Sequence, residues 1–140
     1  MAVQARNKKA PKQDRATKAG LIKPSVKTTA PDIKPGLAVR LRHRMQLNQT
    51  LFARLLPVSV RTLATLESGK PPTEVVARRL NELLRLTNAL SEVIQKESLG
   101  AWLKVPNPAF NGLKPLEVID RGETDRIWSM IFYLRSGVPS

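Results

Sequence analysis

The sequence predicts an all-α protein in which a helical N-terminal bundle is joined by a long helix to a small helical module at the C-terminus. From Leu37 onwards, apolar residues recur at spacings of three and four, which is typical of amphipathic helices. Prolines and glycines separate these segments, and none of them requires a strand. Hydrophobic residues make up 41% of the 140 residues, which is enough for a modest core.

Residues 1–35 are rich in Lys, Ala, Thr and Pro and show no lasting periodicity. Such a composition buries too little apolar surface to offset the entropy lost on ordering. We therefore expect a disordered basic arm over residues 1–35. It would be followed by a helical domain over residues 36–97 and a second unit over residues 98–140.

Four helices are predicted between residues 36 and 97. The first begins at Leu37, the second covers residues 48–56, and the third runs from Ser59 to Gly69. The fourth is long, with an apolar stripe of about five turns that would join the two halves of the chain. The polar residues predicted as N-caps are Asn48, Ser59 and Thr73. The stripe consists of Val76, Leu80, Leu83, Leu84, Thr87, Leu90 and Ile94.

Shorter elements are predicted after Ser98. "SLGAWLK" suggests a brief helix, "VPNPAFNG" is irregular, and "PLEVIDR" places Pro115 in a first helical turn. The last helix, "ETDRIWSMIFYLRS", starts with acids that suit a helix N-terminus. One face of it is expected to carry Ile127, Trp128, Ile131 and Phe132. We expect Trp102 and Trp128 to lie in a small core, and Tyr133 to be exposed.

The composition excludes several classes of protein. The chain has no cysteine, so disulfides, thiolate metal sites and thiol nucleophiles are excluded. A single histidine, His43, argues against a histidine metal site or a catalytic triad. No apolar run approaches the roughly 18 residues of a membrane span, and the N-terminus lacks the apolar core of a signal peptide. We expect a cytoplasmic protein that is not an enzyme and uses no cofactor.

Carboxylates cluster near the C-terminus, and such clusters can bind metal or perform acid–base chemistry. Here Glu123 and Asp125 fall in the first turn of the predicted last helix, with Arg121 and Arg126 close enough to pair with them. We therefore favour helix capping and ion pairing over a metal site or catalysis. The clustered acids are Glu117, Asp120, Glu123 and Asp125.

The positive charge is unevenly distributed. Of the formal +13, residues 1–36 contribute +7, from nine basic and two acidic residues. Residues 37–97 contribute +5, from ten basic and five acidic ones, and residues 98–140 only +1. Nucleic acid is the natural partner of the basic part, because neutralising phosphates releases counterions. The nearly neutral last third indicates a different role.

Residues 49–69, "QTLFARLLPVSVRTLATLESG", have the spacing of a helix-turn-helix. Ala53 lies where two helices pack closely, Val58 lies in the turn, and Leu63 and Leu66 would fill the angle between the helices. The second helix of such a pair recognises bases in the major groove. Arg61 is the best candidate for a base contact, because a guanidinium can bond guanine O6 and N7 together. The DNA-binding candidates are Gln49, Ser59, Val60, Arg61, Thr62, Ala64 and Thr65.

Gln49 has two possible roles at the start of the second helix, because it could hold a phosphate or support the recognition helix. Thr62 and Thr65 could contact either backbone or bases. With "FARLLPVSVRTLATLESGKPPT", the sequence resembles the Xre family of helix-turn-helix regulators. It departs from the family at Pro57, where a glycine is usual, and at Leu66, where a tryptophan is common.

The last third, "LGAWLKVPNPAFNGLKPLEVIDRGETDRI…FYLRSG", resembles the toxin-binding domain of MbcA/ParS/Xre antitoxins. The family's tryptophan–leucine pair, "PNPA", "G-x-x-P-L" step and glycine turn are present at Trp102, Leu103, residues 106–109, Gly112, Pro115, Leu116 and Gly122. The resemblance implies a type II antitoxin whose partner is a RES-domain toxin that consumes NAD. It also implies that this module blocks the toxin's active site, while the helix-turn-helix binds operator DNA and represses the operon.

By position, the end of the last helix and the tail are the candidates for entering the toxin. Arg135 could bind in an anionic, nucleotide-binding site. It could equally be a positive charge at the C-terminal end of the helix. The toxin-binding candidates are Tyr133, Leu134, Arg135, Ser136, Gly137, Val138, Pro139 and Ser140. A homodimer is expected, because helix-turn-helix proteins usually bind paired half-sites. The alternative is a stand-alone regulator whose C-terminal module only dimerises.

Overall fold

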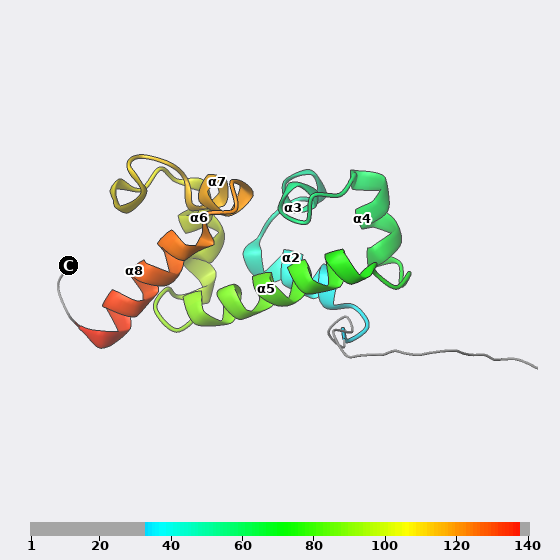
Figure 1. Ribbon diagram of the computed structural model, residues 1–140, viewed down its shortest axis with the longest axis horizontal. Helices are drawn as coiled ribbons and strands as arrows, with labels where there is room; N and C mark the ends of the chain where they lie inside the picture. The colour runs from blue at the N-terminus through cyan, green and yellow to red at the C-terminus, as the bar shows by residue number, and fades with distance from the viewer. Residues whose placement is uncertain (1–32, 138–140) are drawn as a thin grey trace, which may run out of the picture. The chain divides into compact units, whose positions relative to one another are not determined.

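The computed structural model describes residues 33–137, which contain seven α-helices, two short 3-10 helices and no strand (Figure 1). The predicted all-α fold is confirmed for this range. The arm predicted over residues 1–35 lies outside the described residues, except for its last three positions. The elements are α2 (Leu37–Met45), α3 (Gln49–Leu55), α4 (Val60–Glu67), α5 (Glu74–Leu90), η3 (Lys96–Ser98), α6 (Leu99–Lys104), η4 (Pro108–Phe110), α7 (Pro115–Asp120) and α8 (Thr124–Ser136).

Three helices of the N-terminal bundle begin at polar caps. The side-chain oxygens of Asn48, Ser59 and Thr73 each accept a hydrogen bond from the backbone N–H three residues further on, over 2.9, 3.0 and 3.3 Å. Each bond satisfies an N–H group that the first turn of a helix leaves unpaired. The three predicted caps are therefore confirmed, and they fix where α3, α4 and α5 start.

The helices α3 and α4 pack against each other as the helix-turn-helix spacing predicts. Ala53 and Leu63 lie at their contact and are 2% and 0% exposed. Leu66, the other predicted core residue of α4, is only half-buried. The small side chain at position 53 lets the two backbones approach, so the pair presents the outer face of α4 to solvent.

The turn between α3 and α4 contains an unusual proline. The N–H of Val58 donates to Ala53 O over 3.0 Å, so the chain reverses tightly at the end of α3. Pro57 adopts a φ of 23° there. A proline ring favours a φ near −65°, whereas glycine reaches positive values without strain.

The long helix α5 ends earlier than its apolar stripe predicts. Its last residue is Leu90, and the N–H groups of Val93 and Ile94 turn back to Leu90 O over 3.0 and 2.8 Å. Ile94 therefore lies beyond the helix, which corrects the predicted stripe. The hydroxyl of Ser91 donates to Thr87 O over 2.9 Å at this reversal. The chain then returns toward α2 as η3 and α6.

The C-terminal helices pack around Phe110, which is 1% exposed. The ring of Trp102 meets it edge-on, with centroids 6.3 Å apart. The irregular segment before α7 closes on Asn107, whose N–H donates to Leu113 O and whose C=O accepts from Gly112 N, both over 3.0 Å. These two bonds hold the segment between α6 and α7 in a compact turn rather than an extended linker.

The end of α2 packs directly on α6 through Gln46 and Gly100. A Cβ at position 100 would lie 2.4 Å from Gln46 Oε1 and 2.5 Å from its Cβ, so only glycine fits. Gln46 adopts the left-handed conformation with φ 57°, and its Nε2 donates to Lys96 O over 3.0 Å. Lys104 Nζ donates to Gln46 O over 2.9 Å. This contact joins the two predicted halves of the chain.

A second junction is made by Arg79 of α5. Its Nε donates to Leu55 O at the end of α3 over 2.7 Å, and its Nη2 donates to Ile119 O in α7 over 3.1 Å. Beside it, Arg54 and Asp120 form an ion pair of 2.6 Å. One continuous cluster of buried apolar residues extends from α2 to α8, and the described residues belong to one compact unit. The boundary predicted between residues 97 and 98 stays a prediction.

Candidate functional site

The first candidate surface is the exposed face of α4. Ser59 fixes the start of this helix, and Leu63 fixes which side faces the core. Five of the predicted DNA-binding positions in α4 are exposed: Val60, Arg61, Thr62, Ala64 and Thr65. The structure thus brings these residues together on one short helix beside its capping serine, as the helix-turn-helix spacing predicts. Their role in DNA binding stays a prediction.

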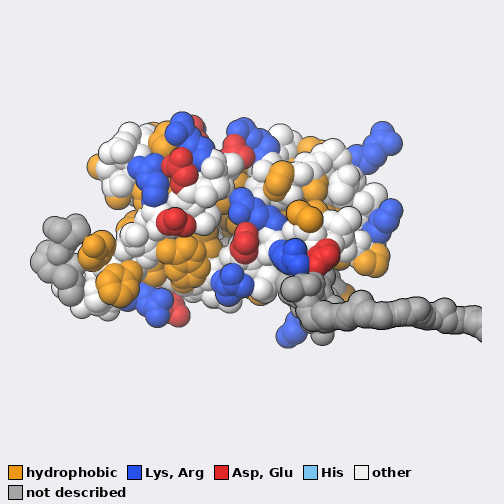
Figure 2. All heavy atoms as spheres, viewed as in Figure 1, with side chains coloured by type: hydrophobic (Ala, Val, Ile, Leu, Met, Phe, Trp, Pro, Cys, Tyr) orange, Lys and Arg blue, Asp and Glu red, His pale blue; other side chains and the backbone are white. Residues whose placement is uncertain are grey.

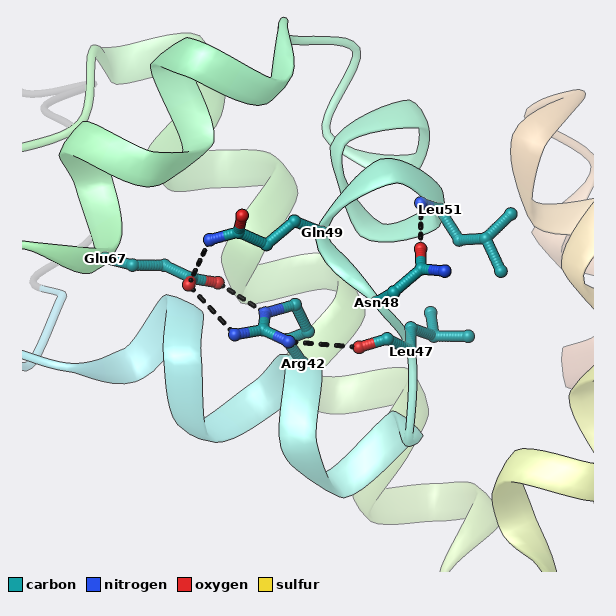
Figure 3. A network of polar contacts seen from close by, with 6 residues as sticks. All are labelled: Arg42, Leu47, Asn48, Gln49, Leu51 and Glu67. Atoms are coloured by element: carbon teal, nitrogen blue, oxygen red, sulfur yellow. Dashed lines mark hydrogen bonds and ion pairs between the residues drawn. The ribbon is translucent and has the colours of Figure 1, made fainter.

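A polar network fixes α4 against α2 and α3 (Figure 3). Glu67 lies at the end of α4 and is paired with Arg42, with Nε–Oε2 and Nη2–Oε1 distances of 2.6 and 3.0 Å. Gln49 Nε2 donates to Glu67 Oε1 over 2.9 Å, and Arg42 Nη1 donates to Leu47 O over 3.2 Å. Gln49 thus holds the end of α4 through Glu67, and whether it also contacts a phosphate stays a prediction.

The same network shifts two pKa values. The hydrogen bond from Arg42 holds the pKa of Glu67 below its ordinary value, outweighing the opposite effect of burial. The bond from Gln49 acts in the same direction. The pKa of Arg42 is raised, chiefly by its hydrogen bond to Glu67. Both side chains stay charged at neutral pH, so the pair locks the angle of α4. The sequence gives little indication of this pair, whose members lie 25 residues apart.

The second candidate surface is the outer side of α8, where Figure 2 shows large hydrophobic side chains gathered. Ile127 and Ile131 face the core and are 0% and 1% exposed. Trp128 was expected in the small core but is 37% exposed, which corrects that expectation, and Phe132, expected on the same face as Ile127, is 65% exposed. α7 and α5 pack against α8. Among the described residues, the edge of its broad apolar stripe that carries Ile127 and Ile131 is buried, whereas the edge with Trp128 and Phe132 is exposed.

The last turn of α8 carries the predicted toxin-binding residues. Tyr133 and Leu134 are 42% and 57% exposed, and the rings of Phe132 and Tyr133 meet edge-on with centroids 5.8 Å apart. Tyr133 is thus exposed, as expected. Gly137 ends the helix with φ 70°, and its N–H donates to Tyr133 O over 3.1 Å. Val138, Pro139 and Ser140 lie outside the described residues.

Arg135 and Ser136 both have partners within the chain. Arg135 Nε lies 3.4 Å from Glu92 Oε1, and both side chains are more than half exposed. Ser136 Oγ donates to Tyr133 O over 3.3 Å. Exposed ion pairs of this kind contribute little to stability, so Arg135 can exchange its partner at small cost. A shallow hollow lies beside it, lined by Trp128, Ile131, Phe132, Arg135 and Ser136.

Three of the four clustered acids of the C-terminal part cap a helix or form an ion pair. Glu117 Oε1 accepts from Lys114 N over 2.8 Å at the start of α7, and Glu123 pairs with Arg126 over 3.0 Å. Asp120 pairs with Arg54, as described above. Within residues 33–137 no group of three His, Cys, Asp or Glu side chains is placed to hold a metal ion. Over the same range, no helix is both long and apolar enough to cross a membrane.

Residues 89–127 match the family model of the antitoxin Xre/MbcA/ParS C-terminal toxin-binding domain, so this segment is similar to that domain. The match begins in the last turn of α5 and ends one residue before the exposed part of α8.

Named relatives extend the similarity to most of the chain. The mycobacterial cidal antitoxin MbcA of Mycobacterium tuberculosis and that of Mycobacterium bovis are each 27% identical over 96 residues, which is 68% of this chain and 85% of theirs. The crystal structure of the M. tuberculosis MbcT–MbcA toxin–antitoxin complex contains a chain of the same fold, with a TM-score of 0.61 and 24% identity. The match covers 75% of this chain and 96% of that one.

Proposed function

We propose that this chain is the antitoxin of a type II toxin–antitoxin pair and that it neutralises a RES-type toxin, which consumes NAD. It is not itself an enzyme. One observation carries the proposal: the match to the toxin-binding domain ends at residue 127, and exposed apolar side chains follow on α8 from Trp128 to Leu134. A domain of this family thus leads directly into an uncovered aromatic surface. Such surfaces are typical of protein interfaces.

The end of α8 would occlude the toxin's active site. Phe132 and Tyr133 supply two large, rigid rings, the kind of side chain that dominates interface energies. Within residues 33–137, Arg135 supplies a cation in an exposed pair with Glu92, so it can turn to an anionic group of a nucleotide-binding cleft. The proposed contact surface therefore runs from Trp128 to Arg135 and includes the hollow between these residues.

The helix-turn-helix would bind operator DNA and repress the operon of the pair. The support is the exposed face of α4 together with the net charge of +13. A homodimer would place two copies of α4 on paired half-sites within a larger toxin–antitoxin complex. DNA binding and toxin binding use different faces, α4 and α8, so each can be tested without the other.

Toxin neutralisation is tested by coexpression with the product of the adjacent gene. We expect Phe132→Ser and Tyr133→Ser each to weaken toxin binding at least about tenfold, since buried aromatic anchors contribute most to interfaces. Val75→Ser is the matched control, because Val75 is an apolar residue of α5 that is 71% exposed. Binding is measured by calorimetry with purified toxin, and cellular NAD is followed during coexpression.

Two results would contradict the proposal. Full affinity in the Phe132 and Tyr133 variants would remove α8 from the interface. Unchanged NAD in cells that express the partner alone would exclude an NAD-consuming toxin.

The exposed apolar side of α8 also fits the alternative of a stand-alone regulator, in which that face joins two copies of the chain. Sedimentation of the free chain separates the two cases. If Phe132→Ser converts a dimer into a monomer and no toxin gene lies nearby, α8 is a dimer surface. If Phe132→Ser changes only the toxin affinity, α8 is not a dimer surface.

A further inference from the structure

The exposed face of α4 offers an unusual set of chemical groups. Opposite the buried Leu63 it presents Arg61, Ala64 and Thr65, with Val60 beside them at 42% exposure. Arg61 is the one exposed charge of the helix, since Glu67 is paired with Arg42. The face is otherwise made largely of methyl groups.

The hydroxyl hydrogens of Ser59, Thr65 and Ser68 are already used within the chain, and Thr62 Oγ1 accepts the one from Ser59. Thr65 Oγ1 donates to Thr62 O over 2.8 Å, and Ser59 Oγ lies 3.0 Å from Thr62 Oγ1. Ser68 Oγ donates to Thr65 O over 2.9 Å. The helix contains no Asn or Gln, and the amide of nearby Gln49 donates to Glu67. The paired amide groups that adenine favours are therefore lacking on α4.

From this face we infer which bases α4 recognises. One is a guanine bound by Arg61. The other is a thymine in the same half-site, whose C5-methyl packs against the methyl groups of Val60, Ala64 and Thr65. The inference rests on the DNA binding proposed above. Guanine presents two acceptors, O6 and N7, which a guanidinium can bond together. Thymine presents the one methyl group of the major groove, which suits an apolar surface.

The geometry also sets the spacing of the two bases. Arg61 and Thr65 are four residues apart, which is about 6 Å along a helix axis. Successive base pairs lie about 3.4 Å apart. The guanine and the thymine should therefore lie about two base pairs from each other in each half-site. The single exposed positive charge and the absence of an unpaired acid on α4 favour the electronegative edge of a guanine at this face.

The test starts with selection of duplexes from random DNA by the full chain. In the selected site, each thymine is replaced by deoxyuridine, which removes only the C5-methyl. Each guanine is replaced by 7-deazaguanine, which removes the N7 acceptor. We expect deoxyuridine at the contacted position to weaken binding about fourfold, the equivalent of one buried methyl group. 7-Deazaguanine should weaken it about tenfold.

Variants then assign each effect to a side chain. Arg61→Ala should remove the sensitivity to 7-deazaguanine, whereas Thr65→Ser and Val60→Ala should reduce the sensitivity to deoxyuridine. The matched controls make the same chemical changes elsewhere: Thr124→Ser in α8 and Val75→Ala in α5 should leave both sensitivities unchanged. Circular dichroism melting confirms that each variant is folded.

The outcomes separate the inference from the proposed function. If no sequence is enriched, α4 does not recognise bases, and both the operator binding and this inference fail. If a site is enriched but tolerates both modified bases, DNA binding stands and the inference alone is overturned. The same holds if the enriched half-site has no A·T pair about two base pairs from its guanine.

Discussion

At Glu67, burial and pairing act on the same carboxylate. The Glu67 and Arg42 side chains are only 10% and 16% exposed, and Gln49 provides a further hydrogen bond. The pair orients α4, but local sequence does not reveal it. By contrast, the exposure of Arg61 and Thr65 follows directly from helical periodicity once Leu63 is placed inside.

Glu67→Gln should lower the free energy of unfolding by about 2 kcal/mol at pH 7, because it leaves Arg42 half-desolvated without its charged partner. The pKa of Glu67 is lower in the folded state than its ordinary value of 4.5. Its contribution is therefore fully present above about pH 4.5 and is lost as the pH falls toward the folded-state pKa.

Urea unfolding at pH 7 and pH 3 measures the cost of Glu67→Gln and its pH dependence. Between pH 7 and pH 3, the Glu67→Gln variant should lose less stability than the unsubstituted protein. The matched control is Glu74→Gln, which changes an exposed pair with Arg78 and should cost no more than roughly 0.5 kcal/mol. Equal losses in the two variants would show that the buried pair contributes nothing beyond a surface one.

At the scale of elements, the sequence predicts the starts of helices better than the direction of their faces. Asn48, Ser59 and Thr73 mark three helix starts because capping is a local interaction. The orientation of α8 is not local. Its stripe from Ile127 to Phe132 is wider than one neighbouring surface can cover, and the packing of α5 and α7 decides which edge is buried.

The contact between α2 and α6 depends on the absence of a side chain at position 100. Gly100→Ala should destabilise the fold by about 1–3 kcal/mol, because its Cβ would overlap Gln46. The double variant Gln46→Gly/Gly100→Ala should recover most of this loss, since glycine also suits the φ of 57° at position 46. Thermal melting of the single and double variants gives the coupling, and strict additivity would refute the steric explanation.

The turn between α3 and α4 can be made more stable by replacing Pro57. Pro57→Gly should raise stability by about 1 kcal/mol, because relief of the strained φ of 23° exceeds the entropy that proline removes from the unfolded chain. The rise in the melting temperature of Pro57→Gly measures this gain in stability. A lower melting temperature would mean that the rigidity of Pro57 matters more than its strain. Gly69, which has φ 115° after α4, is the reference position, and Gly69→Ala should have the opposite sign.

At the scale of the molecule, the two predicted halves share one buried core and should unfold together. Both tryptophans, Trp102 and Trp128, lie in the C-terminal half, so their fluorescence reports that half alone. Circular dichroism reports all helices. The two melting curves should coincide, and distinct midpoints would show two independent units.

Arg79 should contribute strongly to this cooperativity. Arg79→Ala removes the donors to Leu55 O and Ile119 O and should cost about 2–3 kcal/mol. Arg85→Ala is the matched control, as an exposed arginine of the same helix. If fluorescence and circular dichroism transitions separate in the Arg79 variant alone, the guanidinium couples the halves. A loss no larger than that of Arg85→Ala would contradict the assignment.

The bonds of Arg79 also limit how this chain can be recombined. A chimera that joined residues 98–140 to another protein's helix-turn-helix would leave the end of α7 without its donor, and Gly100 without the glutamine it accommodates. A functional transplant would therefore need to carry α5 and the end of α2 with the C-terminal module. In this protein the smallest exchangeable segment is larger than the domain that its sequence motif defines.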